Sequence, residues 1–159
     1  MVTQESQVGS QATTRRQMLI RVIKLRFVPS SMDAGLLFLR LTFGLSLFMK
    51  HGYEKIVNFS AMAPVFSDPM HLGSTTSLVM AMLSDSICSL LVVFGLATRW
   101  ASAWVFIVIF VGWSMQHHFM FFGHLVADHG ELSVLYILAM GAIFIAGPGR
   151  FSIDTKLRD

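Results

Sequence analysis

The sequence is poor in cysteine and in charge. Cys88 is the single cysteine among 159 residues, which excludes an intramolecular disulfide and a dithiol redox centre formed by this chain alone. Charged residues make up 13% of the chain and hydrophobic residues 54%, a balance that would leave a soluble domain of this length short of polar surface. The composition therefore predicts a small membrane protein.

Four long apolar stretches account for most of the chain. They lie near residues 34–49, 77–96, 101–122 and 132–147. A helix needs about 20 mainly apolar residues to cross the hydrocarbon core of a bilayer. We therefore predict an all-α fold, an integral membrane four-helix bundle, in which these stretches are the spans and residues 34–159 form the membrane domain.

Lysine and arginine are distributed unevenly around the predicted spans. They are concentrated in residues 15–26, ahead of the first span, and in residues 150–158, after the last one. By the positive-inside rule, this asymmetry predicts that both termini lie in the cytoplasm. We expect the membrane to be a bacterial inner membrane. Residues 1–33 then form a basic cytoplasmic extension, partly disordered or lying at the membrane surface. Anionic lipid head groups explain the net charge of +3, and nothing indicates nucleic acid.

Two charges interrupt the predicted spans. Arg40 lies within the first span and Asp85 within the second, each roughly 14–16 Å below the same membrane surface at about 1.5 Å per helical residue. A charge near the bilayer centre costs at least about 2.5–3.5 kcal/mol, so we expect the two side chains to meet if these spans pack together. The pair has two interpretations, an ion pair that fixes helix register or a polar anchor for the head group of a quinone.

All six histidines fall at the predicted outer end of the spans. Histidine is a common metal ligand and titrates near neutrality, so His51 and His117 could approach a bound group at this end. The adjacent His117 and His118 diverge by about 100° on a helix, however, and the histidine spacings match no recognised zinc motif. The pattern favours hydrogen-bonded interfacial histidines over a haem or metal site or proton handling, and we assign no metal ligands.

More charged and aromatic residues lie at this outer end. Glu54 and Lys55 follow the first span and Glu131 begins the fourth, where they could line a vestibule or form a solvated helix end with local ion pairs. The aromatic and methionine-rich residues 113–122 could line a flat slot for a quinone ring, or pack against lipid and other helices. No catalytic residue is assigned. The candidate cofactor-binding residues are Arg40, Asp85, His51, Glu54, Lys55, His117 and Glu131.

Short motifs follow one another in a fixed order along residues 34–157. They are LLFLRLTFG at 36–44, HGYEK at 51–55, Asp85 ten residues before GLATR at 95–99, and GPGRFSID at 147–154. In this order and spacing, the chain resembles the DoxX family of small four-helix membrane proteins. Asp85 stands where the family usually has glutamate, and the basic N-terminal extension and histidine-rich outer end are further departures.

The resemblance implies a four-helix membrane bundle and, from some family members, a subunit of a quinone-linked sulfur or oxygen redox complex. In a first hypothesis, the chain binds a quinone near Arg40 and Asp85 while partner subunits supply the electron-transferring groups, because the sequence has no flavin motif or iron–sulfur spacing. In a second, it is a non-catalytic accessory subunit that stabilises or anchors a larger membrane complex. Catalysis by this chain alone is not expected under either hypothesis.

Overall fold

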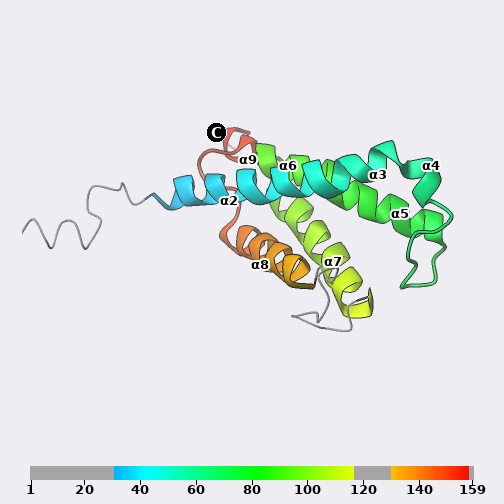
Figure 1. Cartoon of the computed structure of the whole chain (residues 1–159). Helices are drawn as coiled ribbons and strands as arrows, with labels where there is room; N and C mark the ends of the chain where they lie inside the picture. Colours follow the sequence, from blue (N-terminus) through cyan, green and yellow to red (C-terminus); the bar gives the residue numbers. More distant parts are fainter. Residues whose placement is uncertain (1–30, 117–129, 158–159) are drawn as a thin grey trace, which may run out of the picture. The chain divides into compact units, whose positions relative to one another are not determined.

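The computed structural model describes residues 31–116 and 130–157, and this part of the chain contains helices and no strand (Figure 1). Its first long helix is continuous from Met32 to Val57. It consists of α2 (Met32–Leu47), the π-helix η1 (Phe48–Gly52) and α3 (Tyr53–Val57). The helix therefore runs eight residues past the predicted end of the first span, at residue 49. Lys55, expected at a solvated helix end, is buried.

The other long helices follow the predicted spans more closely. The second long helix begins at Ser74 and ends at Phe94. It consists of α5 (Ser74–Met82), the π-helix η2 (Leu83–Cys88) and α6 (Ser89–Phe94). The other elements are α4 (Phe59–Met62), α7 (Thr98–Gln116), α8 (Gly130–Ala146) and the short α9 (Ile153–Lys156). Residues 117–129, which include the end of the third predicted span, lie outside the described part of the chain.

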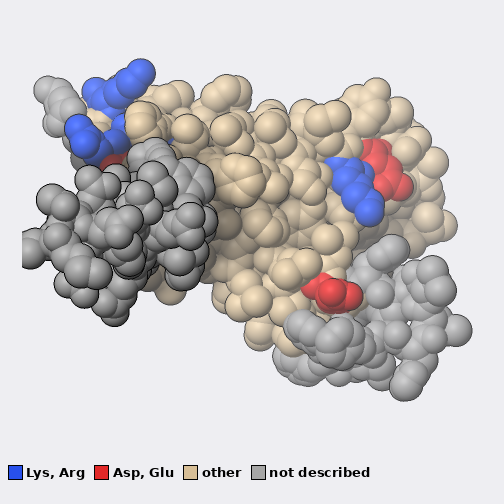
Figure 2. All heavy atoms as spheres, turned by 60° about the vertical axis from the view of Figure 1, so that its left-hand side comes forward, with Lys and Arg blue, Asp and Glu red and all other residues tan. Residues whose placement is uncertain are grey.

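Among residues 31–116 and 130–157, three helices are long and apolar enough to cross a membrane, Met32–Val57, Ser74–Phe94 and Thr98–Met115. Helix α8 is a shorter apolar helix of 17 residues. On the face that Figure 2 shows, the charged side chains lie in separate groups with an uncharged surface between them. Such a surface suits helices surrounded by lipid. The all-helical membrane class predicted from the sequence is confirmed, whereas the cytoplasmic placement of the termini stays a prediction.

The helices pack in two main pairs around one apolar core. Helix α8 packs along α7, α2 packs along α6, and η1 lies against η2. The buried core residues are Leu47, Val92, Ala101, Val105, Tyr136, Met140 and Ile143. Gly44 lets α2 approach α6 closely, because a Cβ atom there would lie 2.6 Å from Val93 Cγ2. Small residues at helix contacts are the usual means of close packing within a membrane.

Candidate functional site

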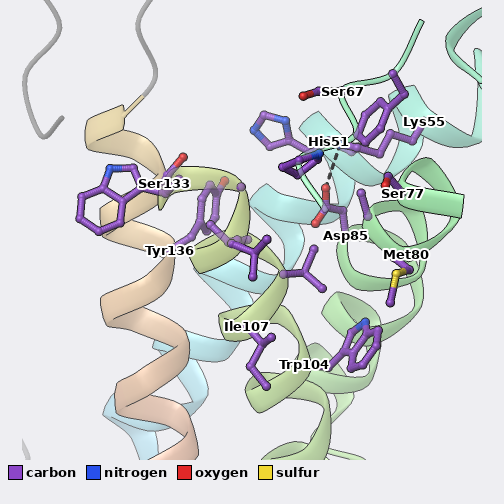
Figure 3. Close-up of a pocket in the computed structure, with 18 of the residues that line it drawn as sticks. His51, Lys55, Ser67, Ser77, Met80, Asp85, Trp104, Ile107, Ser133 and Tyr136 are labelled. Atoms are coloured by element: carbon purple, nitrogen blue, oxygen red, sulfur yellow. Dashed lines mark hydrogen bonds and ion pairs between the residues drawn. The ribbon is translucent and has the colours of Figure 1, made fainter. Parts of the chain in front are cut away.

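A cavity of about 480 Å³ lies among η1, α3, α5, η2, α7 and α8 (Figure 3). Most of its wall is apolar, and a small set of polar side chains interrupts it. The polar residues that line it are His51, Lys55, Ser67, Ser77, Asp85, Ser133 and Tyr136. A mostly apolar cavity of this size with a few polar groups is typical of a site for a small organic ligand.

The polar part of the cavity is built around an ion pair. Lys55 Nζ lies 2.8 Å from Asp85 Oδ2, and both side chains are buried. Lys55 Nζ also lies 3.4 Å from the backbone carbonyl oxygen of His51, one helical turn earlier. Because an ammonium group carries three N–H donors, one donor of Lys55 is left for a ligand. The two opposite charges cancel, so the pair adds no net charge to the cavity.

The two π-helices bring the members of this ion pair together. Asp85 lies within η2, and Lys55 lies in α3, three residues after the end of η1. Gly52, the last residue of η1, sits so close to η2 that a Cβ atom would overlap the backbone carbonyl group of Asp85. Short π-helical segments within α-helices are frequent at functional sites, where they redirect side chains. The close approach at Gly52 explains how side chains from two helices meet within the bundle.

Tyr136 of α8 places a phenol beside this polar group. Its hydroxyl lies 2.7 Å from Ser46 Oγ, a hydrogen bond that either group can donate. Its ring lies edge to face with those of His51 and Phe43, at centroid distances of 6.2 and 5.9 Å. Sequence reasoning missed Tyr136, although a tyrosine within an otherwise apolar span signals a polar group that needs a partner.

A loop before α5 contributes further lining residues, and Asp68 attaches it to that helix. The Asp68 carboxylate accepts hydrogen bonds from Ser77 Oγ at 2.7 Å, and from the backbone N–H groups of Leu72 at 3.0 Å and Gly73 at 2.6 Å. The hydrogen bond from Ser77, supported by those of the backbone, holds the pKa of Asp68 below its usual value. Phe66 and the residues up to Leu72 are thereby held against the cavity.

Arg40 lies away from this cavity, so the expected pairing of Arg40 with Asp85 is wrong. Its side chain is 0% exposed, and its Nη2 donates a hydrogen bond to the carbonyl oxygen of Phe151 at 2.7 Å. The reason is the length of the first helix, which continues past the predicted span end and carries Lys55 to the carboxylate instead. Arg40 is fifteen residues earlier, roughly 22 Å along the helix axis at about 1.5 Å per residue.

Arg40 instead helps to hold the C-terminal segment at the opposite end of the bundle. There the Asp154 carboxylate accepts hydrogen bonds from Ala97 N at 2.7 Å, Thr98 N at 2.8 Å and Thr98 Oγ1 at 2.7 Å. The Asp154 N–H donates to the carbonyl oxygen of Gly95 at 2.9 Å. Much of the GPGRFSID motif is therefore explained by attachment of the chain end to the α6–α7 turn.

The structure thus brings together three of the seven candidate residues, His51, Lys55 and Asp85. Glu54 and Glu131 are exposed and do not line the cavity, and His117 lies outside the described residues. Trp113, from the aromatic stretch, does line it. Within residues 31–116 and 130–157, no group of three or more His, Cys, Asp or Glu side chains is placed to hold a metal ion.

Comparison with known proteins gives one match. The model of the family described as DoxX matches residues 35–118, just over half of the chain. No curated protein and no solved structure matches the sequence. The matched residues include the ion pair and all of the α7 residues that line the cavity.

Proposed function

The chain belongs to the DoxX family, and we propose that it is a membrane subunit that binds a quinone in the cavity beside Lys55 and Asp85. One observation carries the proposal. A buried ion pair with a spare N–H donor lies at one side of an otherwise apolar cavity within a membrane protein. A charged pair in this setting is costly, and intramembrane ionisable residues commonly mark functional sites.

The chemistry of the cavity matches that of a quinone ring. A quinone is a flat apolar ring whose carbonyl oxygens accept hydrogen bonds, and Lys55 has one N–H group to donate. Trp104 and Trp113 line the cavity and offer aromatic surfaces beside such a ring. Because Lys55 and Asp85 neutralise each other, the cavity favours an uncharged head group over an anionic lipid or a phosphate.

His51 gives the same site a group that exchanges protons, and Tyr136 lies beside it. Both line the cavity, and their rings are in contact with each other. Reduction of a quinone adds two protons to its carbonyl oxygens, and histidine is the side chain best suited to proton exchange near neutral pH. Their position supports a site in which the bound ring can take up or release protons.

We further propose that partner subunits of a redox complex supply the electrons, since the sequence has one cysteine and no flavin motif. The uneven lysine and arginine distribution supports a bacterial cytoplasmic membrane with both termini in the cytoplasm. Labelling of single cysteines introduced at Val65 and Leu157, both exposed, in a Cys88→Ser background tests this topology. We expect an impermeant reagent added to intact cells to label Val65→Cys and not Leu157→Cys, and the reverse pattern would overturn the orientation.

Quinone binding can be tested with the tryptophans of the cavity, because a bound quinone quenches the fluorescence of nearby indole rings. The probe is a benzoquinone with one isoprene unit, titrated into the protein in lipid nanodiscs. Lys55→Met/Asp85→Leu removes the polar anchor without leaving a lone buried charge, and we expect it to abolish saturable quenching. A Trp100→Phe background removes the exposed tryptophan that does not line the cavity.

A matched pair of glycine variants separates filling of the cavity from a general effect on the helices. A Cβ atom at Gly112, which lines the cavity, meets nothing within 4 Å, and the same holds at Gly35, which does not line it. Gly112→Leu should lower the affinity for the benzoquinone probe by about tenfold or more, because the leucine side chain would occupy the space of the ligand. Gly35→Leu should leave that affinity unchanged. Unsaturable quenching that all variants share would refute quinone binding and favour the accessory-subunit hypothesis.

A further inference from the structure

One face of α7 forms an apolar stripe along the cavity. Trp104, Ile107, Val108 and Val111 all line it, and their spacing places them on the same side of a helix. Met80 and Ala81 of α5 line the same cavity. Helices α5 and α7 therefore share its wall, and the main contacts of α7 are with α8, α6 and η2.

Two residues of this stripe are also exposed at the surface of the protein. Ile107 is 53% exposed and Trp104 is 36% exposed, although both residues line the cavity. Both lie within the helix Thr98–Met115, which is long and apolar enough to span a membrane, so the surface outside them faces lipid. In Figure 3, Trp104, Ile107 and Met80 lie lower in the view, and the Lys55–Asp85 pair, His51 and Tyr136 lie above them.

The geometry points to a ligand with two parts, and we propose that a long hydrocarbon tail leaves the cavity past Ile107, between α5 and α7, into the bilayer. This inference rests on the proposed function, since the head group is the ring bound beside Lys55 and Asp85. It adds the class of quinone, one with a long polyisoprenoid tail, and it identifies Ile107 as a residue that determines specificity for the tail.

The size of the cavity supports this arrangement. A volume of about 480 Å³ suits a drug-sized molecule, which is enough for a ring and the first part of a tail. A long polyisoprenoid chain must continue outside, and hydrocarbon is stable there only if the exit opens to lipid. The loop held by Asp68 also contributes Phe66, Pro69 and Met70 to the wall, but it lies outside the helices that are long enough to span a membrane, so a tail that left past this loop would not enter the hydrocarbon core.

A matched pair of isoleucines allows a direct test. Ile107 and Ile87 are each 53% exposed and each lie in a helix long enough to span a membrane, but Ile87 does not line the cavity. Equilibrium binding of two tritium-labelled probes is measured in nanodiscs, the benzoquinone with one isoprene unit and the same ring with a long polyisoprenoid tail. We expect Ile107→Trp to weaken binding of the long-tailed probe by about tenfold more than binding of the short-tailed probe, because the indole ring narrows the exit that only the long tail must pass.

The outcomes separate this inference from the proposed function. If both probes bind the wild type and Ile107→Trp affects them no more than Ile87→Trp does, the tail exit is refuted while the ring site stands. An equal loss of both probes in Ile107→Trp would place the ring at Ile107 and also refute the exit. If neither probe binds the wild type, both proposals are refuted. Ile107→Phe is the second variant, to be used if the tryptophan variant does not elute as a single folded species.

Discussion

Lys55 and Asp85, thirty residues apart in sequence, form an ion pair of 2.8 Å between the first and second long helices. Each belongs to a helix whose regular α-geometry is interrupted by a π-helix close to the charged residue. The pair therefore links the packing of two helices to the polar chemistry of the cavity.

Removing one member of the pair should be worse than removing both. Lys55→Met leaves the Asp85 carboxylate buried without a counter-charge, and we expect a loss of about 3–5 kcal/mol in the free energy of unfolding. Lys55→Met/Asp85→Leu should recover most of that loss. Unfolding in detergent with a double-mutant cycle measures the coupling, with Lys50→Met, at an exposed lysine, as the control. Additive single losses would mean that the two side chains contribute independently.

Gly52 should be intolerant of even the smallest side chain. A Cβ atom there would overlap the backbone of Asp85, so Gly52→Ala must push η1 away from η2, at a cost of about 1–3 kcal/mol. Gly112→Ala is the control, since its Cβ atom meets nothing within 4 Å, and its stability should be equal to or slightly above that of the wild type. Equal thermal midpoints for the two variants would contradict the close approach at Gly52.

Replacing Arg40 should affect amide exchange in the C-terminal segment more than it affects the thermal midpoint of the whole protein. Arg40→Met removes the hydrogen bond to the Phe151 carbonyl, so amide deuterium exchange in residues 150–157 should become faster by about tenfold. The same change also removes two buried donors without partners, Arg40 Nε and Nη1, which offsets part of the loss. We therefore expect a smaller drop in thermal midpoint than for Lys55→Met. The control is Arg150→Met, whose side chain is exposed, and unchanged exchange in Arg40→Met would refute the attachment.

The loop that borders the cavity should detach in acid. The pKa of Asp68 is lowered in the folded protein, chiefly by the Ser77 hydrogen bond, so its attachment is fully present above the usual aspartate pKa. It is lost as the pH falls through the lowered, folded value. Deuterium exchange of residues 66–73 as a function of pH should show this transition.

Two variants check the origin of that transition. Ser77→Ala should move it to higher pH, because the largest contribution to the lowered pKa of Asp68 is removed. Thr75→Ala, at an exposed position in the same helix, should leave it in place. A transition that Ser77→Ala does not move would show that the hydrogen bond does not control the loop.

The sequence predicted the setting of this protein much better than its site. Apolar stretches of sufficient length identified the membrane class, and the ordered motifs identified the DoxX family, which the family match confirms. Hydropathy falls after residue 49, so the sequence ends the first helix eight residues too early and favours a solvated position for Lys55. That error in the helix end gives Asp85 the wrong partner, Arg40 in place of Lys55. Burial of a charged residue depends on the neighbouring helix, which hydropathy along one segment does not report.

Tyr136 and the α7 stripe show a second reason why the site could not be predicted from the sequence. On a spanning helix, lipid-facing and cavity-facing positions are both apolar, so composition alone cannot tell Ile107 from Ile87. The rotation of each helix about its axis decides which residues meet, and that rotation depends on contacts between helices. His51 was named among the candidates for its chemistry, whereas its contact with Tyr136 required the packing of η1 against α8.

The π-helix η1 also changes how insertions and deletions would act on this protein. In a π-helix the hydrogen bonds reach one residue further than in an α-helix, so the segment accommodates an extra residue without breaking the helix. Deleting one residue from Phe48–Gly52 would return the segment to α-geometry and keep Lys55 directed toward Asp85. Deleting one residue from the regular turns of α2 would instead rotate everything after it by about 100° and separate Lys55 from Asp85. Within the first helix, η1 is therefore the segment where a change in length disturbs the ion pair least.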